Sequence, residues 1–186
     1  VQTCALPIFH QWRGRHARGR VTIVRYADDF VMGFETVADA RRMVRDLKDR
    51  LARFGLQLHE EKTRLIEFGR FAARTRKARG NQRPETFAFL GFTHYCGTTR
   101  DGRFMVKHRT QSARLTRKLT AIRQEMRRRM HQPLALQHRW LASVLRGHYG
   151  YFGMPHNWRS LNAFRQDVRR SWFKSLQRRK IGRAHV

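Results

Sequence analysis

The spacing of apolar residues changes from strand-like to helix-like near residue 108. Before that point, two apolar and β-branched runs at residues 21–26 and 30–34 flank Ala27-Asp28-Asp29. This pattern predicts a β-hairpin that carries both carboxylates at its tip. Apolar residues at steps of three and four then predict an amphipathic helix over residues 37–54, which Gly55 is well placed to end.

Short strands and turns are predicted for the rest of this first part. Residues 56–58 and 64–68 are predicted as strands on either side of the polar turn HEEKT, and residues 70–84 as an exposed basic loop. The run FAFLGFTHYC, residues 87–96, predicts one strand. A turn at Arg100-Asp101-Gly102 leads into another strand over residues 103–107.

The part beyond residue 108 is predicted to be helical throughout. Apolar residues recur at helical spacing in three segments, which are residues 115–126, 134–145 and 161–176. The predicted fold class is therefore α+β, with a mixed part followed by an all-helical part. No apolar run approaches the roughly 18 residues of a membrane span, so we expect no membrane partner.

The two ends of the chain resemble translations of a common sequencing-library adapter. They read VQTCALPI over residues 1–8 and IGRAHV over residues 181–186. Appended segments of this kind are set aside in reasoning about the fold. We therefore expect the natural sequence to span about residues 9–180 and its gene to be truncated at both sides.

The net charge of +28 and the isoelectric point near 11.9 indicate a polyanionic partner, with nucleic acid the first candidate. After Asp101 the only acids are Glu125 and Asp167. Most basic residues are arginines, which suit forked contacts to phosphate and stacking on bases. Outside the adapter-like ends Cys96 is the only cysteine, which excludes a disulfide framework and suits a reducing cytoplasm.

Asp28 and Asp29 at the predicted hairpin tip are candidate ligands for Mg²⁺. This hard cation prefers oxygen ligands and keeps several of its waters. In phosphoryl transfer, two such ions about 4 Å apart activate the attacking oxygen and stabilise the leaving one. The other interpretation of the same residues is a solvated acidic turn that has no catalytic role.

Several motifs occur in a characteristic order along the chain. YADD is followed by GLQLHEEKTRLIEFG, by FAFLGF, and by WLASVLRGHYGYFGMPHNWRSLNAF within the basic helical region. This order resembles the reverse transcriptases encoded by group II introns, and the last segment is similar to their maturase (thumb, or X) region. The resemblance covers residues 19–179. It implies a partial palm with its primer grip over residues 9–108 and a helical thumb/maturase domain over residues 109–180.

The resemblance implies an RNA-directed DNA polymerase that uses Mg²⁺, an RNA template, a DNA primer and deoxynucleoside triphosphates. Asp28 and Asp29 would be the catalytic carboxylates that bind the metal, with Asp28 the more direct ligand. Lys62 would lie near the incoming triphosphate; otherwise it is a solvated turn lysine. The primer-binding residues would be Tyr26, Ala27, Phe89, Leu90, Gly91 and Phe92, of which the aromatic and apolar ones equally suit a core.

The resemblance also implies that the helical part binds intron RNA, which proteins recognise largely by shape, phosphates and stacking on exposed bases. The candidate RNA-binding residues are Arg127, Arg128, Arg129, Arg139, Arg146, Tyr149, Tyr151, Trp158, Arg159, Arg169 and Arg170. Tyr149, Tyr151 and Trp158 are predicted to lie in a loop-like stretch. Trp140 and Trp172 fall at the spacing of a helical core, and His148 and His156 are interpreted as polar or RNA-facing.

Other functions fit parts of the pattern. One is a splicing maturase that binds RNA without polymerising, although an intact YADD argues against it. Another is a reverse transcriptase outside introns, such as a retron or a diversity-generating element, and a third is a generic basic RNA-binding fragment. A palm polymerase also needs a carboxylate from an earlier strand and a fingers domain, so we expect this polypeptide not to polymerise alone. A homodimer remains open.

Overall fold

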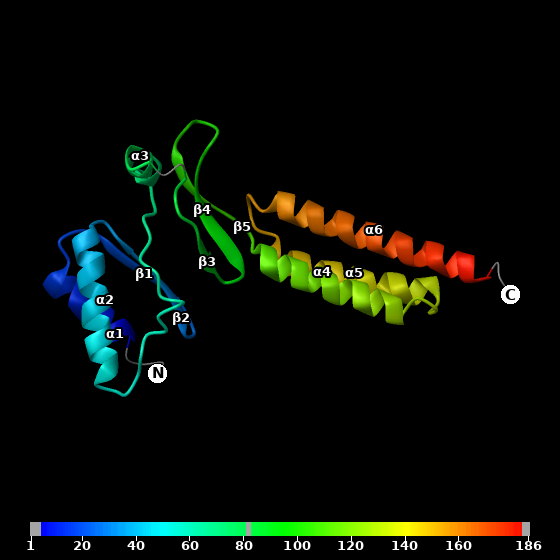
Figure 1. Cartoon of the computed structure of the whole chain (residues 1–186), viewed down its shortest axis with the longest axis horizontal. Helices are drawn as coiled ribbons and strands as arrows, with labels where there is room; N and C mark the ends of the chain where they lie inside the picture. The colour runs from blue at the N-terminus through cyan, green and yellow to red at the C-terminus, as the bar shows by residue number, and fades with distance from the viewer. Residues whose placement is uncertain (1–4, 81–82, 184–186) are drawn as a thin grey trace. The chain divides into compact units, whose positions relative to one another are not determined.

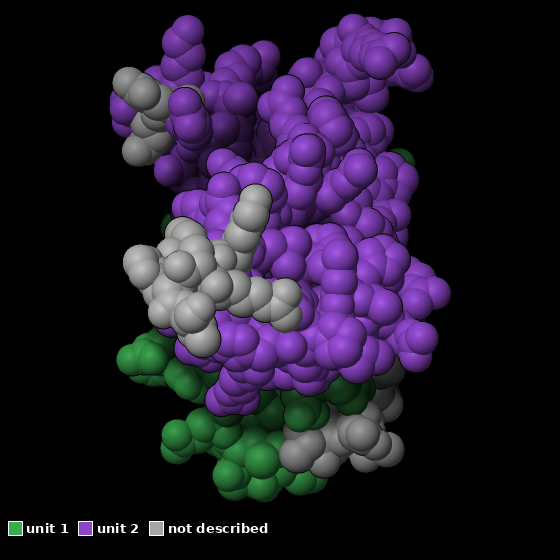
Figure 2. All heavy atoms as spheres, turned by 90° about the vertical axis from the view of Figure 1, so that its right-hand side faces the viewer, with its two compact units in different colours: residues 1–67 green, residues 68–186 purple. Residues whose placement is uncertain are grey.

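The computed structural model describes residues 5–80 and 83–183, and it divides into two compact units, Val1–Glu67 and Phe68–Val186. Figure 1 shows the elements in chain order, and Figure 2 distinguishes the units by colour. The fold is α+β, as predicted, with small antiparallel sheets and six helices among the described residues. The two compact units divide at residue 67, whereas the predicted domains divide at residue 108. Compact units and domains are not the same division, so the predicted domain boundaries stay predictions.

The first unit packs two helices on one two-stranded hairpin. Its elements are α1 Ala5–His16, β1 Val21–Tyr26, β2 Asp29–Phe34 and α2 Val37–Ala52. The alternation of β1 buries Val21 and half-buries Ile23, because successive side chains of a strand face opposite sides. The core of this unit is formed by Phe9, Trp12, Val21 and Met43. The predicted hairpin and the predicted helix are both confirmed.

A buried carboxylate fixes the chain just before the hairpin. Asp39 is 3% exposed and accepts hydrogen bonds from the backbone N–H groups of Arg18 and Gly19, at 3.0 and 3.1 Å. Its own N–H donates to the Thr36 hydroxyl, which caps the first turn of α2. Asp39 therefore ties the entry of β1 to the start of α2.

The strands predicted at residues 56–58 and 64–68 do not form. Both runs are irregular, on either side of a turn that includes Glu60, Glu61 and Lys62. A strand is stabilised by the hydrogen bonds of a neighbour, and no described segment pairs with either run. The alternation of apolar residues was therefore not sufficient to predict a strand in these two runs.

The second unit begins with a short helix where an exposed loop was predicted. Helix α3, Ala72–Ala78, has the sequence AARTRKA, and alanine, arginine and lysine are all good helix formers. Arg76 holds it to the following segment through an ion pair with Glu85 at 3.1 Å and a hydrogen bond to the Arg83 carbonyl.

A three-stranded antiparallel sheet follows, in the order β3-β4-β5. Its strands are β3 Phe87–Phe89, β4 Phe92–Thr98 and β5 Phe104–Thr110. The single strand predicted over residues 87–96 is therefore wrong, because Leu90 and Gly91 form a turn within it. The predicted turn at residues 100–102 and the strand after it are confirmed.

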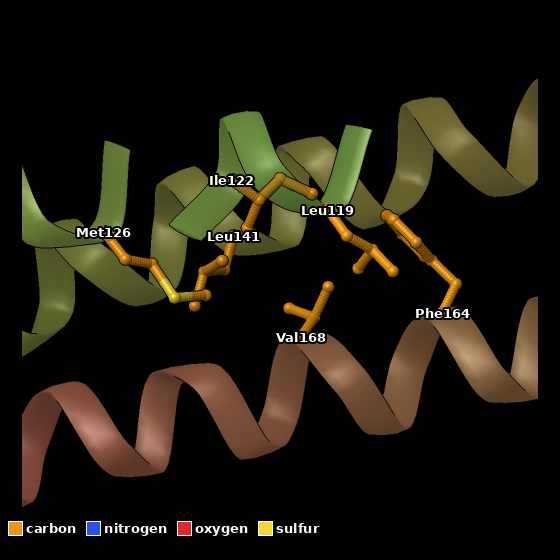
Figure 3. Packing of buried hydrophobic residues seen from close by; sticks show 6 residues of the cluster. All are labelled: Leu119, Ile122, Met126, Leu141, Phe164 and Val168. Carbon is orange, nitrogen blue, oxygen red and sulfur yellow. The ribbon is translucent and has the colours of Figure 1, made fainter. Parts of the chain in front are cut away.

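Three helices complete the second unit. They are α4 Ser112–Arg128, α5 Leu134–Phe152 and α6 Trp158–Arg183. Helices α4 and α6 extend the predicted segments at both ends, and α5 begins at the predicted residue and extends beyond the predicted C-terminal end. Figure 3 shows their inward side chains meeting, and the core residues are Leu119, Ile122, Met126, Leu141, Phe164 and Val168. None of the described helices combines the length and the apolarity that crossing a membrane would require.

Four predicted aromatic and histidine placements can be judged from the helical part. Trp140 and Trp172 are half-buried against its core, as their spacing predicted. His148 is 6% exposed and stacks on Phe164 with 3.7 Å between ring centroids. The interpretation of His148 as an RNA-facing residue is therefore wrong, whereas His156 is exposed.

Candidate active site and nucleic-acid interface

The tip of the first hairpin is a two-residue turn held in a strained conformation. Tyr26 pairs with Asp29 across the strands, which leaves Ala27 and Asp28 as the turn. Ala27 has a φ of 51°, and a left-handed backbone costs a residue with a side chain about 1–2 kcal/mol. The Arg25 side chain donates a hydrogen bond to the Ala27 carbonyl at 2.8 Å. Strain of this kind concentrates at functional sites.

Both carboxylates at this tip are exposed and available to a ligand. Asp28 lies in the turn and Asp29 opens β2, directly opposite Tyr26 and on the same face of the hairpin. Neither carboxylate forms a hydrogen bond or an ion pair within the described residues. Two adjacent carboxylates suit Mg²⁺, which accepts one or two protein carboxylates and completes its shell with water and substrate phosphates. No cluster of three or more metal-binding side chains occurs among residues 5–80 and 83–183.

Lys62 lies in the same unit as the aspartates, in an exposed turn. The backbone N–H groups of Lys62 and Thr63 both donate to the His59 carbonyl, at 3.1 and 2.9 Å. Neighbouring Glu60 pairs with Lys48 at 3.4 Å, whereas no described contact joins the Lys62 side chain to either aspartate. Lys62 is exposed, and its ammonium forms no ion pair with any residue that the structure describes.

The second predicted primer-contacting segment forms a tight hairpin turn in the other unit. Phe89 pairs with Phe92, and Leu90 and Gly91 between them both have positive φ, 49° and 79°. Two positive φ angles define a type I′ turn, whose first position usually holds asparagine, aspartate or glycine. Leucine at that position is therefore strained.

Neighbouring elements of the second unit enclose this turn. Gly91 is buried, and a Cβ added there would lie 3.4 Å from the Arg114 side chain and 3.5 Å from the Phe152 ring. The Gly91 carbonyl accepts from the Gln111 N–H at 2.9 Å. The glycine thus permits the left-handed turn, and the start of α4 and the end of α5 lie at van der Waals distance from it.

The three aromatic residues predicted to lie in a loop-like stretch have different environments. Tyr149 and Tyr151 belong to α5 and Trp158 to α6, so the loop prediction is wrong for all three. Tyr149 packs against the bundle core, and Tyr151, although 53% exposed, donates a hydrogen bond to the Leu90 carbonyl at 3.0 Å. Trp158 begins α6 and is 65% exposed, so its face is open to a stacking partner.

A basic surface runs along α5 and the end of α4. Arg139 and Arg146 are exposed, lie two turns apart on α5, and line two shallow pockets. The Arg129 guanidinium lies 5.1 Å from the centre of the Trp140 ring and pairs with Glu125 at 2.7 Å. The remaining predicted RNA-binding arginines are exposed; they are Arg127, Arg128, Arg159, Arg169 and Arg170.

Two of these arginines have acidic neighbours, at the two acidic positions of the helical part. Arg128 pairs with Glu125 at 3.6 Å and Arg170 with Asp167 at 3.3 Å. Both arginines keep more than two thirds of their side-chain surface exposed, at 79% and 69%. Such exposed pairs contribute little to stability, so neither arginine is withdrawn from a polyanionic partner.

Comparison with known families decides what kind of protein this is. A family model described as "Reverse transcriptase (RNA-dependent DNA polymerase)" matches residues 1–94, half of the chain. The chain belongs to the reverse transcriptase family. The match contains both strained turns, at Ala27-Asp28 and at Leu90-Gly91. Comparison with curated proteins and with solved structures gives no significant match.

The range matched in this reverse transcriptase bears on the adapter-like ends. It includes residues 1–8, and α1 begins at Ala5. Residues 1–4 and 184–186 lie outside the described part of the chain, as do the side chains of residues 5–8 and 180–183. The adapter origin of both ends therefore stays a prediction.

The structure of this reverse transcriptase shows residues near the Leu90-Gly91 turn that sequence analysis did not single out. Gln111 and Arg114 contact it from the start of α4. Asn157 lies nearby in the second unit and is bonded to the last residue of β5. The only sequence signal for Asn157 was its place in the segment Pro155-His156-Asn157 of the maturase-like region.

Proposed function

We propose that this reverse transcriptase is encoded by a group II intron, copies RNA into DNA, and binds intron RNA to aid splicing and mobility. The observation that carries the polymerase part is the strained hairpin tip inside the range matched by the family. Its two carboxylates are exposed and have no partner among the described residues. The basic helical part supports the RNA-binding role. The gene product as a whole is the proposed polymerase.

In this proposal the two units contribute different groups. Asp28 and Asp29 hold Mg²⁺, which when bound activates the attacking oxygen and stabilises the leaving one. Tyr26 and Ala27 approach the primer end, and the Lys62 ammonium offsets charge on the triphosphate. The turn flanked by Phe89 and Phe92 contacts the primer strand.

The helical part contributes charge and stacking surfaces toward intron RNA. The shallow pockets beside Arg139 and Arg146 offer guanidinium groups to phosphates, and the exposed Trp158 offers a ring to an unpaired base. An RNA-binding maturase without polymerase activity is the second candidate, and a reverse transcriptase outside introns is the third. The exposed aspartate pair favours polymerisation over the second, and the maturase-like segment favours an intron origin over the third.

Primer extension tests the polymerase. The gene product that contains this chain should extend a DNA primer on an RNA template with Mg²⁺, and Asp28→Asn or Asp29→Asn should abolish extension. Asp101→Asn, which changes an exposed aspartate of the β4–β5 turn, serves as the matched control and should leave extension intact. Equal extension by wild type and Asp28→Asn would refute the assignment.

RNA binding separates the remaining candidates. The dissociation constant is compared for the intron RNA from the source DNA and for an unrelated structured RNA of equal length. Extension together with preference for the intron RNA supports the proposal. Preference without extension indicates a maturase alone, and extension without preference indicates a reverse transcriptase outside introns.

A further inference from the structure

The end of α5 contacts the β3–β4 turn through a specific polar bond and through ring packing. The Tyr151 hydroxyl donates to the Leu90 carbonyl at 3.0 Å, across 61 residues of sequence. The Tyr151 ring stacks on Phe92 with a centroid distance of 6.1 Å and an interplanar angle of 12°. Phe152 packs edge-on against the same Phe92 ring at 5.2 Å.

The corner between α5 and α6 is itself fixed to the sheet. Asn157 is 1% exposed; its side-chain oxygen accepts from the Thr110 N–H at 2.8 Å, and its amide donates to the Thr110 hydroxyl and the Phe152 carbonyl, each at 2.9 Å. Thr110 ends β5 and pairs with Phe92 in the register. Phe92, which flanks the turn, is therefore held from two sides: it packs against α5 and pairs with β5.

The turn contacted in this way is strained, so its conformation depends on its surroundings. Leu90 has a φ of 49°, which an L-residue leaves readily unless neighbours prevent it. The Leu90 and Gly91 carbonyls are held by Tyr151 and by the Gln111 N–H, respectively. The hydrogen bonds from Tyr151 of α5 and from Gln111, which precedes α4, thus fix the peptide groups of Leu90 and Gly91.

We propose that Tyr151 is a positioning residue, whose hydroxyl fixes the Leu90–Gly91 turn and with it the place of the primer end. The inference rests on the proposed function, in which this turn contacts the primer. The helical part then acts in catalysis as well as in RNA binding, because α5 and the turn keep one fixed geometry.

Steady-state primer extension with the gene product tests the positioning role. Tyr151→Phe keeps the ring that stacks on Phe92 and removes only the hydroxyl. It should lower kcat about five-fold, equivalent to about 1 kcal/mol, with KM for primer–template changed less than about two-fold. Tyr95→Phe removes the same atom from a half-buried tyrosine of β4 without a hydroxyl bond in the described residues, and it should leave kcat unchanged.

Amide hydrogen exchange on the present chain gives a readout that does not depend on activity. In Tyr151→Phe the Gln111 amide, which donates to Gly91, should exchange at least about five-fold faster, since a loosened turn opens that bond more often. The Thr99 amide, which donates to Arg103 in the β4–β5 turn, should be unchanged.

These results separate failure of the inference from failure of the proposed function. An active wild type with unchanged kcat in Tyr151→Phe, or unchanged Gln111 exchange, overturns the positioning role alone. A wild type that extends no primer overturns the proposed polymerase and, with it, the catalytic part of this inference. Faster exchange at Gln111 together with the kcat loss supports it.

Discussion

Replacing Asn157 by alanine should destabilise the second unit more than a typical buried substitution does. The change removes three hydrogen bonds at once and leaves the Thr110 N–H, the Thr110 hydroxyl and the Phe152 carbonyl without their partner. A buried polar group left unsatisfied costs about 1–3 kcal/mol. Because these groups share one site and the hydroxyl can rotate, we expect a total loss of about 3–5 kcal/mol rather than the full sum.

Urea denaturation followed by tryptophan fluorescence measures this loss, since Trp140, Trp158 and Trp172 all lie in the helical part. Asn162→Ala is the matched control, because Asn162 is a half-buried asparagine of α6 without a side-chain hydrogen bond among the described residues. It should change the free energy of unfolding by no more than about 0.5 kcal/mol. A loss below about 1 kcal/mol for Asn157→Ala would refute the view that this residue fastens the α5–α6 corner to β5.

Three further predictions follow from burial, backbone conformation and charge. Burial lowers the pKa of His148 to about 4, below its ordinary 6.5. The neutral imidazole therefore contributes fully to the free energy of unfolding above about pH 6.5, and this contribution is lost as pH falls toward 4. Up to about 3 kcal/mol of stability should disappear over that window, and His148→Phe should remove this part of the pH dependence of urea unfolding. Gly91→Ala should cost about 1–2 kcal/mol in the same assay for its left-handed backbone, about as much as Gly102→Ala, because the two glycines have a similar φ and neither leaves an added Cβ closer than van der Waals contact. Arg139→Ala and Arg146→Ala should each weaken RNA binding and reduce the slope of log K against log salt by about 1, whereas an unchanged slope would remove both from the interface.

The elements predicted correctly are those whose signals are local. The first hairpin needs only two β-forming runs and a two-residue turn, and α2 needs only its apolar stripe with Thr36 as its cap. The same holds for α4, α5 and α6, although the positions where they end were missed. Trp140 and Trp172 were assigned to the core by spacing alone.

Several errors concern features that depend on contacts distant in sequence, whereas α3 was missed although its residues are good helix formers. Residues 56–58 have the alternation of a strand, but a strand requires a partner that the sequence pattern does not reveal. The turn at Leu90-Gly91 was hidden because leucine is unusual in a type I′ turn, and its stabilising partner Tyr151 is 61 residues away. His148 was misjudged because only the fold shows the Phe164 ring on which it stacks.

The three non-glycine residues with positive φ in the described part of the chain are Ala27, Leu90 and His156. They fall in YADD, in FLGF and in Pro155-His156-Asn157, the same segments that carry the family resemblance. Glycine or asparagine would relieve each backbone, so stability alone does not explain these residues. Each is accompanied by a specific bond: Arg25 to Ala27, Tyr151 to Leu90, and Asn157 beside His156 to Thr110. The strained positions and the bonds beside them therefore indicate that each turn is held in a fixed shape within its own unit.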